Sequence, residues 1–144
     1  MTSPLLFTPY KLGNQTLSNR IMISPMCQYS AHDGNANDWH LTHLGSLAIS
    51  GAALLCVEAT AVSVEGRITH GCLGLYNDAN QAALKKTVDA IRAIAPVKLG
   101  IQLSHAGRKA SSQRPWEGGA LIPVAEGGWQ PLAPSAIAHK PEEA

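Results

Sequence analysis

The sequence has few charged side chains and no marked excess of either sign. Charged residues make up 15% of the 144 positions, and 11 basic against 10 acidic side chains leave a net charge of +1. Nucleic acids and anionic membranes attract proteins through clustered basic charge, so this balance excludes both as electrostatic partners. Apolar runs are also short, and none approaches the roughly 20 residues that a membrane-spanning helix needs.

Signals for secretion and for metal binding are missing as well. The first residues carry no basic segment followed by an apolar core, so no signal peptide is predicted and a cytoplasmic location is expected. Cys27, Cys56 and Cys72 are odd in number and lack CxxC spacing, which indicates free thiols. His40 and His43 lie three positions apart, but no third ligand is placed to join them, and no metal site is predicted.

What the chain does contain is an alternation of apolar strands with amphipathic helices. The predicted elements are a hairpin over 5–19, strands over 20–24, 53–61 and 97–104, and helices over 39–50 and 78–95. Strand–helix–strand order with short connections favours parallel strands and right-handed crossovers. A small open α/β sheet and a piece of an eight-stranded barrel both accommodate this order. The barrel is favoured, because neither a phosphate loop nor a GxGxxG motif accompanies the strands.

The predicted fold is therefore α/β, with three β/α units over residues 1–144 that form the N-terminal part of a (β/α)8 TIM barrel. A complete barrel needs roughly 250 residues. The hairpin is expected to plug the open end of the barrel, and residues 106–144 are expected to form a capping loop or lid. Asp78 and Gln81 are expected to form a capping box at the start of the second helix, which Pro96 ends.

The stretch Asn19–Ser30 ends a predicted buried strand with groups that can do chemistry. Pro25 stops the strand, and Met26, Cys27 and Tyr29 follow. Barrel enzymes place their active-site residues at the carboxyl ends of strands, so this is a candidate site. Two plainer alternatives stay open, a packed Cys27 and a structural Tyr29 hydroxyl, because no histidine stands beside the thiol to activate it.

The strand over 97–104 alternates cleanly between apolar and mixed positions. Gln102 belongs to the mixed face, which looks inward in a barrel. Its amide carries a donor and an acceptor together, which suits the edge of a planar heterocycle such as a flavin pyrimidine. Arg108 and Lys109 follow in the next loop, where they would face an anionic ligand or form an ordinary solvated pair.

Glu58 is a carboxylate inside the strand predicted over 53–61. A buried carboxylate needs a partner, because an unpaired charge is costly away from water. Arg20, at the start of the neighbouring strand, is the candidate, and the pair is interpreted as structural.

Three phrases give the chain a likeness to a known family. They are PMCQYSA over 25–31, VEATAVSVEGRIT over 57–69 and QLSHAGRKA over 102–110. In this order they resemble the Old Yellow Enzyme family of FMN-dependent ene-reductases, most closely the bacterial class that includes xenobiotic reductase A. The likeness extends over essentially the whole chain and corresponds to the N-terminal portion of the family's TIM barrel.

The resemblance implies a role for each residue that matches the family's motifs. Cys27 would modulate the flavin and Tyr29 would hold or polarise the substrate, so these two are the implied catalytic residues. The implied FMN contacts are Ser24, Pro25, Met26, Cys27, Ala59 and Gln102. The implied substrate pocket consists of Tyr29, Ile68 and Lys109. No metal is implied.

The resemblance also implies an NADPH-dependent reaction in two halves. NADPH donates a hydride to FMN, and the hydride then passes to the β-carbon of an enone or nitroalkene. The family's substrate-anchoring histidine pair and its FMN phosphate loops are expected outside residues 1–144. The C-terminal remainder of the barrel, in the same or a separate chain, is therefore an expected partner, and the complete enzyme is expected to be a homo-oligomer.

Two other functions stay open from the sequence. The chain can be an inactive or flavin-binding partial barrel that acts only as an assembly module. It can also be an unrelated α/β domain in which Cys27 is a nucleophile. The three matched phrases favour the reductase over both.

Overall fold

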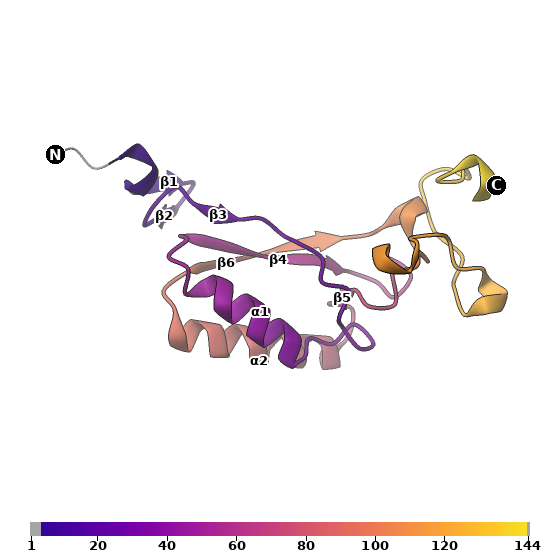
Figure 1. The fold of residues 1–144 in the computed structure, drawn as a ribbon, viewed down its shortest axis with the longest axis horizontal. Coiled ribbons are helices and arrows are strands. Elements are labelled where there is room, and N and C mark those ends of the chain that lie inside the picture. The colour runs from indigo at the N-terminus through magenta and orange to yellow at the C-terminus, as the bar shows by residue number, and fades with distance from the viewer. Residues whose placement is uncertain (1–3, 144) are drawn as a thin grey trace.

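The computed structural model describes residues 4–143 and centres on one parallel sheet (Figure 1). Its strands are β3 (Met22–Ile23), β4 (Leu54–Ala61), β5 (Leu73–Gly74) and β6 (Lys98–Ser104). Strand β6 pairs with β4 along its whole length. Strands β3 and β5 pair with the beginning and the end of β4, so they share its other edge. The longest apolar strand of the sequence is therefore the centre of the sheet.

Two helices cover one face of this sheet, α1 (Asp38–Ala48) and α2 (Asp78–Ile94) (Figure 1). The core lies between the helices and the strands. Leu55 of β4 and Ile91 of α2 are completely buried there, and Leu44 of α1 is nearly so. Each helix buries the apolar stripe that its sequence repeats at three- and four-residue intervals. No helix in the described part of the chain is long and apolar enough to cross a membrane.

Asparagine side chains begin both helices. The Asn37 side chain accepts a hydrogen bond from the Trp39 N–H and so caps α1. The prediction of an Asp78–Gln81 capping box was wrong, because Asn77 is the cap of α2 and accepts the Asn80 N–H at 2.8 Å. Asp78 is instead the first helical residue, where its negative charge favours the helix N-terminus.

The predicted N-terminal hairpin is present. Strand β1 (Tyr10–Leu12) pairs antiparallel with β2 (Gln15–Leu17) after a 3-10 turn over Leu5–Phe7. Gly13 turns the chain with φ +56°, a conformation that glycine adopts without strain. The hairpin lies near the end of the sheet at which β4 begins (Figure 1). Its function as a barrel plug stays a prediction.

Strand lengths and edges differ from the sequence expectation. The ladder of β3 extends over two residues, because only Leu54 and Leu55 face it. Strand β5 lies in a segment that was predicted as loop, and it pairs Leu73 with Thr60. Leu103 belongs to the predicted apolar face of β6 yet is 58% exposed, because no described element covers that end of the strand.

Residues 106–143 leave the carboxyl end of β6 and form an excursion without long helices or strands (Figure 1). Short 3-10 turns punctuate it at Gly107–Lys109, Pro115–Glu117, Val124–Glu126 and Pro141–Glu143. A single bridge pairs Ser112 with Leu121. This agrees with the predicted capping loop in position, while its action as a lid stays a prediction.

Candidate active site at the carboxyl ends of the strands

The residues singled out from the sequence meet where β3, β4 and β6 end. Residues 24–30 follow β3, Ala59 lies near the end of β4, and Gln102 lies near the end of β6. Ala59 and Gln102 are direct partners in the β4–β6 ladder. Parallel strands bring their carboxyl ends to one edge of a sheet, which explains why positions far apart in the sequence converge.

A β-bulge in β4 produces this pairing. The ladder runs Val57 opposite Ile101 and then Ala59 opposite Gln102, so Glu58 is an extra residue without a partner in β6. Val57 packs into the core below the sheet. The extra residue turns the following position to the other face, so Ala59 shares the side of Gln102. The hydrophobic periodicity of the sequence does not predict the bulge.

The Cys27 thiol and the Tyr29 hydroxyl lie together at this edge. Burial raises the pKa of the Cys27 thiol, and the negative charge of Glu58 and the nearby Cys72 raise it further. Hydrogen bonds from the Ala59 backbone and from Tyr29 act in the opposite direction, because they stabilise the thiolate. Cys27 is therefore poised mainly as a neutral thiol near neutral pH.

Tyr29 is held in an unusual conformation. Burial is the main cause that raises the pKa of Tyr29 to about 12, and the nearby Cys27 and Cys72 contribute to the same rise. The Tyr29 backbone has φ +52°. This left-handed conformation is energetically unfavourable for any residue other than glycine. Gly71 packs against this backbone so closely that a Cβ there would lie 2.2 Å from the Tyr29 carbonyl oxygen. The phenol is thus a neutral donor, fixed in place by its surroundings.

Trp116 of the excursion packs beside Tyr29. The two rings lie 5.8 Å apart and meet edge to face. The Arg114 guanidinium lies over the Trp116 ring and pairs with Glu117. The sequence did not predict a role for Trp116, although an aromatic residue in a Gly- and Pro-rich loop often indicates a functional contact.

Gln102 is exposed, and its side chain has no hydrogen-bond partner within residues 4–143. Its neighbours on this face are small, with Gly100 two residues before it and Ala59 opposite it in the ladder. A free amide among small residues fits the edge of a planar ring that offers both a donor and an acceptor. Met26 is 47% exposed at the same edge, while Ser24 lies exposed and Pro25 half-buried before it.

Ile68 and Lys109 come close through their backbones. The Ser112 N–H donates to the Ile68 carbonyl at 2.8 Å, and the Ser112 hydroxyl donates to the Lys109 carbonyl at 2.9 Å. Lys109 is exposed, as an anion-facing side chain must be. Arg108 is turned away instead, because its guanidinium donates to the Ser135 and Ile137 carbonyls of the excursion. Arg108 therefore holds the excursion rather than facing a ligand.

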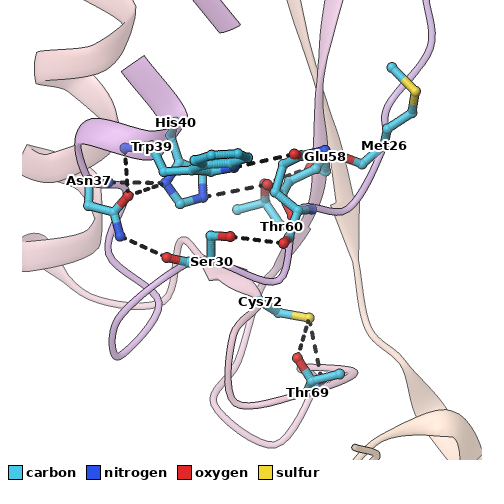
Figure 2. Close-up of polar contacts among 10 residues, drawn as sticks. Met26, Ser30, Asn37, Trp39, His40, Glu58, Thr60, Thr69 and Cys72 are labelled. Carbon is cyan, nitrogen blue, oxygen red and sulfur yellow. Dashed lines mark hydrogen bonds and ion pairs between the residues drawn. The ribbon is translucent and has the colours of Figure 1, made fainter. Parts of the chain in front are cut away.

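The predicted Glu58–Arg20 pair was wrong. The Arg20 guanidinium donates to the Thr8 hydroxyl at 3.3 Å and lies over the Tyr10 ring at 5.1 Å. Glu58 instead faces His40 of α1, with 3.5 Å between the carboxylate Oε1 and the imidazole Nε2 (Figure 2). The bulge explains the error, because it turns Glu58 toward the helices rather than toward the start of the neighbouring strand.

The two histidines of α1 have separate partners. His40 is buried beside Glu58, while His43 stacks on the exposed Trp39 ring.

Two cavities lie away from the carboxyl ends of the strands. One of about 500 Å³ is lined by excursion residues such as Trp129, and one of about 590 Å³ lies between the hairpin and the beginning of β6.

A family profile described as NADH:flavin oxidoreductase / NADH oxidase matches residues 5–132, which is most of the chain. The chain belongs to this family. Among curated relatives, it is 47% identical over 141 residues to an NADH:flavin oxidoreductase of Gibberella zeae, covering 96% of this chain and 34% of the relative. It is 52% identical over 107 residues to an NADPH dehydrogenase of Listeria monocytogenes, covering 73% of this chain and 31% of the relative.

Solved structures agree with the family. Morphinone reductase matches with a TM-score of 0.76 and 31% identity, over 95% of this chain and 33% of that protein. The old yellow enzyme of Trypanosoma cruzi matches with a TM-score of 0.75 and 30% identity, over 96% of this chain and 36% of that protein. These neighbours are TIM-barrel old yellow enzymes, so the α/β unit corresponds to part of such a barrel. The chain spans about a third of the length of the curated relatives it matches.

Proposed function

We propose that this chain forms the flavin-ring wall of an FMN-dependent reductase that oxidises NADPH and reduces activated C=C bonds. The observation that carries the proposal is the convergence of Cys27, Ala59 and Gln102 at the carboxyl ends of three parallel strands, where Ala59 and Gln102 are ladder partners. Family membership supports FMN as the cofactor and a nicotinamide as the electron donor. One solved relative, morphinone reductase, is described in complex with tetrahydroNAD.

The residues present fit the ring of the cofactor. The Gln102 amide offers a donor and an acceptor to its pyrimidine edge, and the small Ala59 allows a flat ring to approach the sheet. Ser24, Pro25 and Met26 line one border of this surface through the segment after β3. FMN, when bound, supplies hydride transfer between the nicotinamide and the alkene. Its phosphate is assigned to parts of the barrel outside residues 4–143.

Cys27 and Tyr29 act on the flavin ring and on the substrate that lies over it. A Tyr29 hydroxyl with a pKa of about 12 stays protonated, so it donates a hydrogen bond to an oxygen that gains negative charge. The neutral Cys27 thiol borders the ring and tunes its surroundings without acting as a nucleophile. Ile68 and Lys109 border the mouth of the substrate pocket. The proposed substrates are enones and nitroalkenes, whose carbonyl or nitro oxygens suit such a donor.

The decisive measurement is flavin affinity in the holoprotein. Gln102→Leu keeps the size of the side chain and removes its donor and acceptor. Losing about 1.4 kcal/mol of hydrogen bonding raises the dissociation constant of FMN about tenfold. Gln81→Leu, on the exposed surface of α2, is the matched control and leaves the affinity unchanged.

Turnover is tested separately, as NADPH-dependent loss of 2-cyclohexenone by the flavin-loaded protein. Flavin binding with no turnover would favour the assembly-module alternative. Equal flavin affinity in Gln102→Leu and Gln81→Leu would sink the proposed ring-binding surface.

A further inference from the structure

The segment that carries Cys27 and Tyr29 has no strand or helix of its own. The ladder of β3 ends at Ile23, and residues 24–30 adopt irregular backbone. The backbone polar groups of such a segment need partners other than a neighbouring strand. The candidate site therefore requires anchors that the sheet ladder does not supply.

The bulged residue of β4 supplies one such anchor. Glu58 is 4% exposed, and its Oε2 accepts the Gln28 backbone N–H at 2.9 Å. Gln28 stands between Cys27 and Tyr29, so this contact restrains the backbone between the two functional side chains, together with the Ser30 hydroxyl that donates to the Gln28 carbonyl at 3.0 Å. A hydrogen bond to an ionised carboxylate is among the stronger ones in proteins.

His40 lies beside the Glu58 carboxylate on the helix side, and its buried Nε2 has no hydrogen-bond partner within the described residues. The His40 side chain is 1% exposed, and its Nε2 lies 3.5 Å from the Glu58 Oε1 (Figure 2). The Asn37 backbone N–H donates to the His40 Nδ1 at 3.1 Å, and this nitrogen also lies 3.0 Å from the Asn37 Oδ1. Asn37 also donates through its side chain to the Ser30 carbonyl at 2.7 Å. One connected set of polar contacts therefore spans α1, β4 and the site segment.

We propose that Glu58 is a positioning residue, which holds the Cys27 thiol and the Tyr29 hydroxyl at the site through the Gln28 N–H. The holding is a property of this chain alone. What the held groups do rests on the proposed function. Glu58 has two separable effects on Cys27: its contact with Gln28 limits opening of the segment, and its charge disfavours the thiolate.

Alkylation of Cys27 by iodoacetamide, resolved from Cys56 and Cys72 by mass spectrometry, separates these effects in the holoprotein. The rate at high pH, where the thiol is fully ionised, reports access to the segment. The pH midpoint of the rate reports the thiol pKa. Tyr29 and Cys72 also face the thiol, and His40 faces Glu58; none of these is changed in the variants.

Glu58→Asp keeps the charge but withdraws the carboxylate from the Gln28 N–H by one methylene. We expect the high-pH rate to rise about tenfold, as when one charge-assisted hydrogen bond no longer opposes opening, with the midpoint unchanged. Glu58→Gln keeps an acceptor for Gln28 and removes the charge. We expect its midpoint to fall while the high-pH rate stays within twofold of the parent protein, roughly the scatter of such effects. Glu126→Asp and Glu126→Gln, at an exposed position, are the matched controls.

The outcomes are distinct. A high-pH rate in Glu58→Asp equal to that of the parent would overturn the positioning role, because the contact would then hold nothing. A midpoint unmoved in Glu58→Gln would overturn the charge effect. Both readouts are taken with and without FMN, so a failure of flavin binding is seen separately and leaves the thiol measurement decisive.

Discussion

The sheet with its two helices and the excursion after β6 are held together by different means. In residues 20–104, parallel ladders join the strands, and the completely buried Leu55 and Ile91 join the sheet to α2. Among residues 106–141 and 143 of the excursion, only Ala110 and Ser111 are buried. The first region is stabilised by apolar packing, and the second depends on single polar atoms.

Those polar atoms can be named. The Ser111 hydroxyl donates to the Ile122 carbonyl at 2.9 Å and accepts the Trp129 N–H at 2.8 Å. The Arg108 guanidinium donates to carbonyls at Ser135 and Ile137. Apolar burial is spread over many contacts, whereas a hydrogen bond depends on two atoms. Substitutions should therefore act over the whole first region, and only locally in the excursion.

The largest effect is expected in the core. Leu55→Ala removes a completely buried side chain and should lower the free energy of unfolding by about 2–5 kcal/mol. Val124→Ala, in the excursion and 64% exposed, should change it by less than about 0.5 kcal/mol. Urea denaturation followed by circular dichroism measures both. Equal losses in the two variants would contradict the difference between the regions.

A smaller and local effect is expected at Ser111. Ser111→Ala leaves the Ile122 carbonyl and the Trp129 N–H unpaired, which costs about 1–3 kcal/mol. Hydrogen exchange should show loss of protection at the Trp129 amide with the β4 amides unchanged. Ser112→Ala is the control, since the Ser112 hydroxyl contacts only the Lys109 carbonyl at an exposed position. Loss of protection in β4 would show that the excursion and the sheet unfold as one unit.

The same difference explains what the sequence predicted. Hydrophobic periodicity depends on many residues, so α1, α2, β4 and β6 were expected within a few positions of their observed bounds. The position of Gln102 on the face of β6 away from the core also followed from the alternation, while its inward orientation in a barrel stays a prediction. Strand β5 and the full extent of β3 were misjudged, because ladders of two residues leave no periodic signal.

The sequence did not predict contacts that depend on the placement of single side chains. The partner of Glu58 was predicted to be Arg20 and is His40, because one inserted residue in the β4 ladder turns the carboxylate toward the helix. The contact of Trp116 with Tyr29 was not expected either, since it depends on the path of the excursion. Patterns of two or more turns are readable in a sequence, and a bulge of one residue is not.

A contact between the regions should have an intermediate effect. The Trp129 indole N–H donates to the Glu65 carbonyl at 2.9 Å, which joins the excursion to the loop after β4. Trp129→Phe keeps a ring for Arg67 and removes the hydrogen bond, so it should cost about 0.5–1.5 kcal/mol. Limited proteolysis of the excursion should become faster. Trp116→Phe is the control, because it keeps a ring against Tyr29, and it should leave the cleavage rate unchanged.

The smallest effect is expected on the solvent side of the well-packed region. Lys85 and Asp89 form an i,i+4 ion pair on α2, with side chains 69% and 51% exposed. Solvent screens such pairs, so a double-mutant cycle with Lys85→Ala and Asp89→Ala should give a coupling of about 0.3–0.5 kcal/mol. The cycle uses urea denaturation at low salt, and the coupling should shrink at 1 M salt. A coupling as large as the loss from Ser111→Ala would mean that location in the packed region, rather than burial of the partner atoms, decides the cost. A small coupling energy indicates instead that burial of the partner atoms, and not location in the packed region, decides the cost.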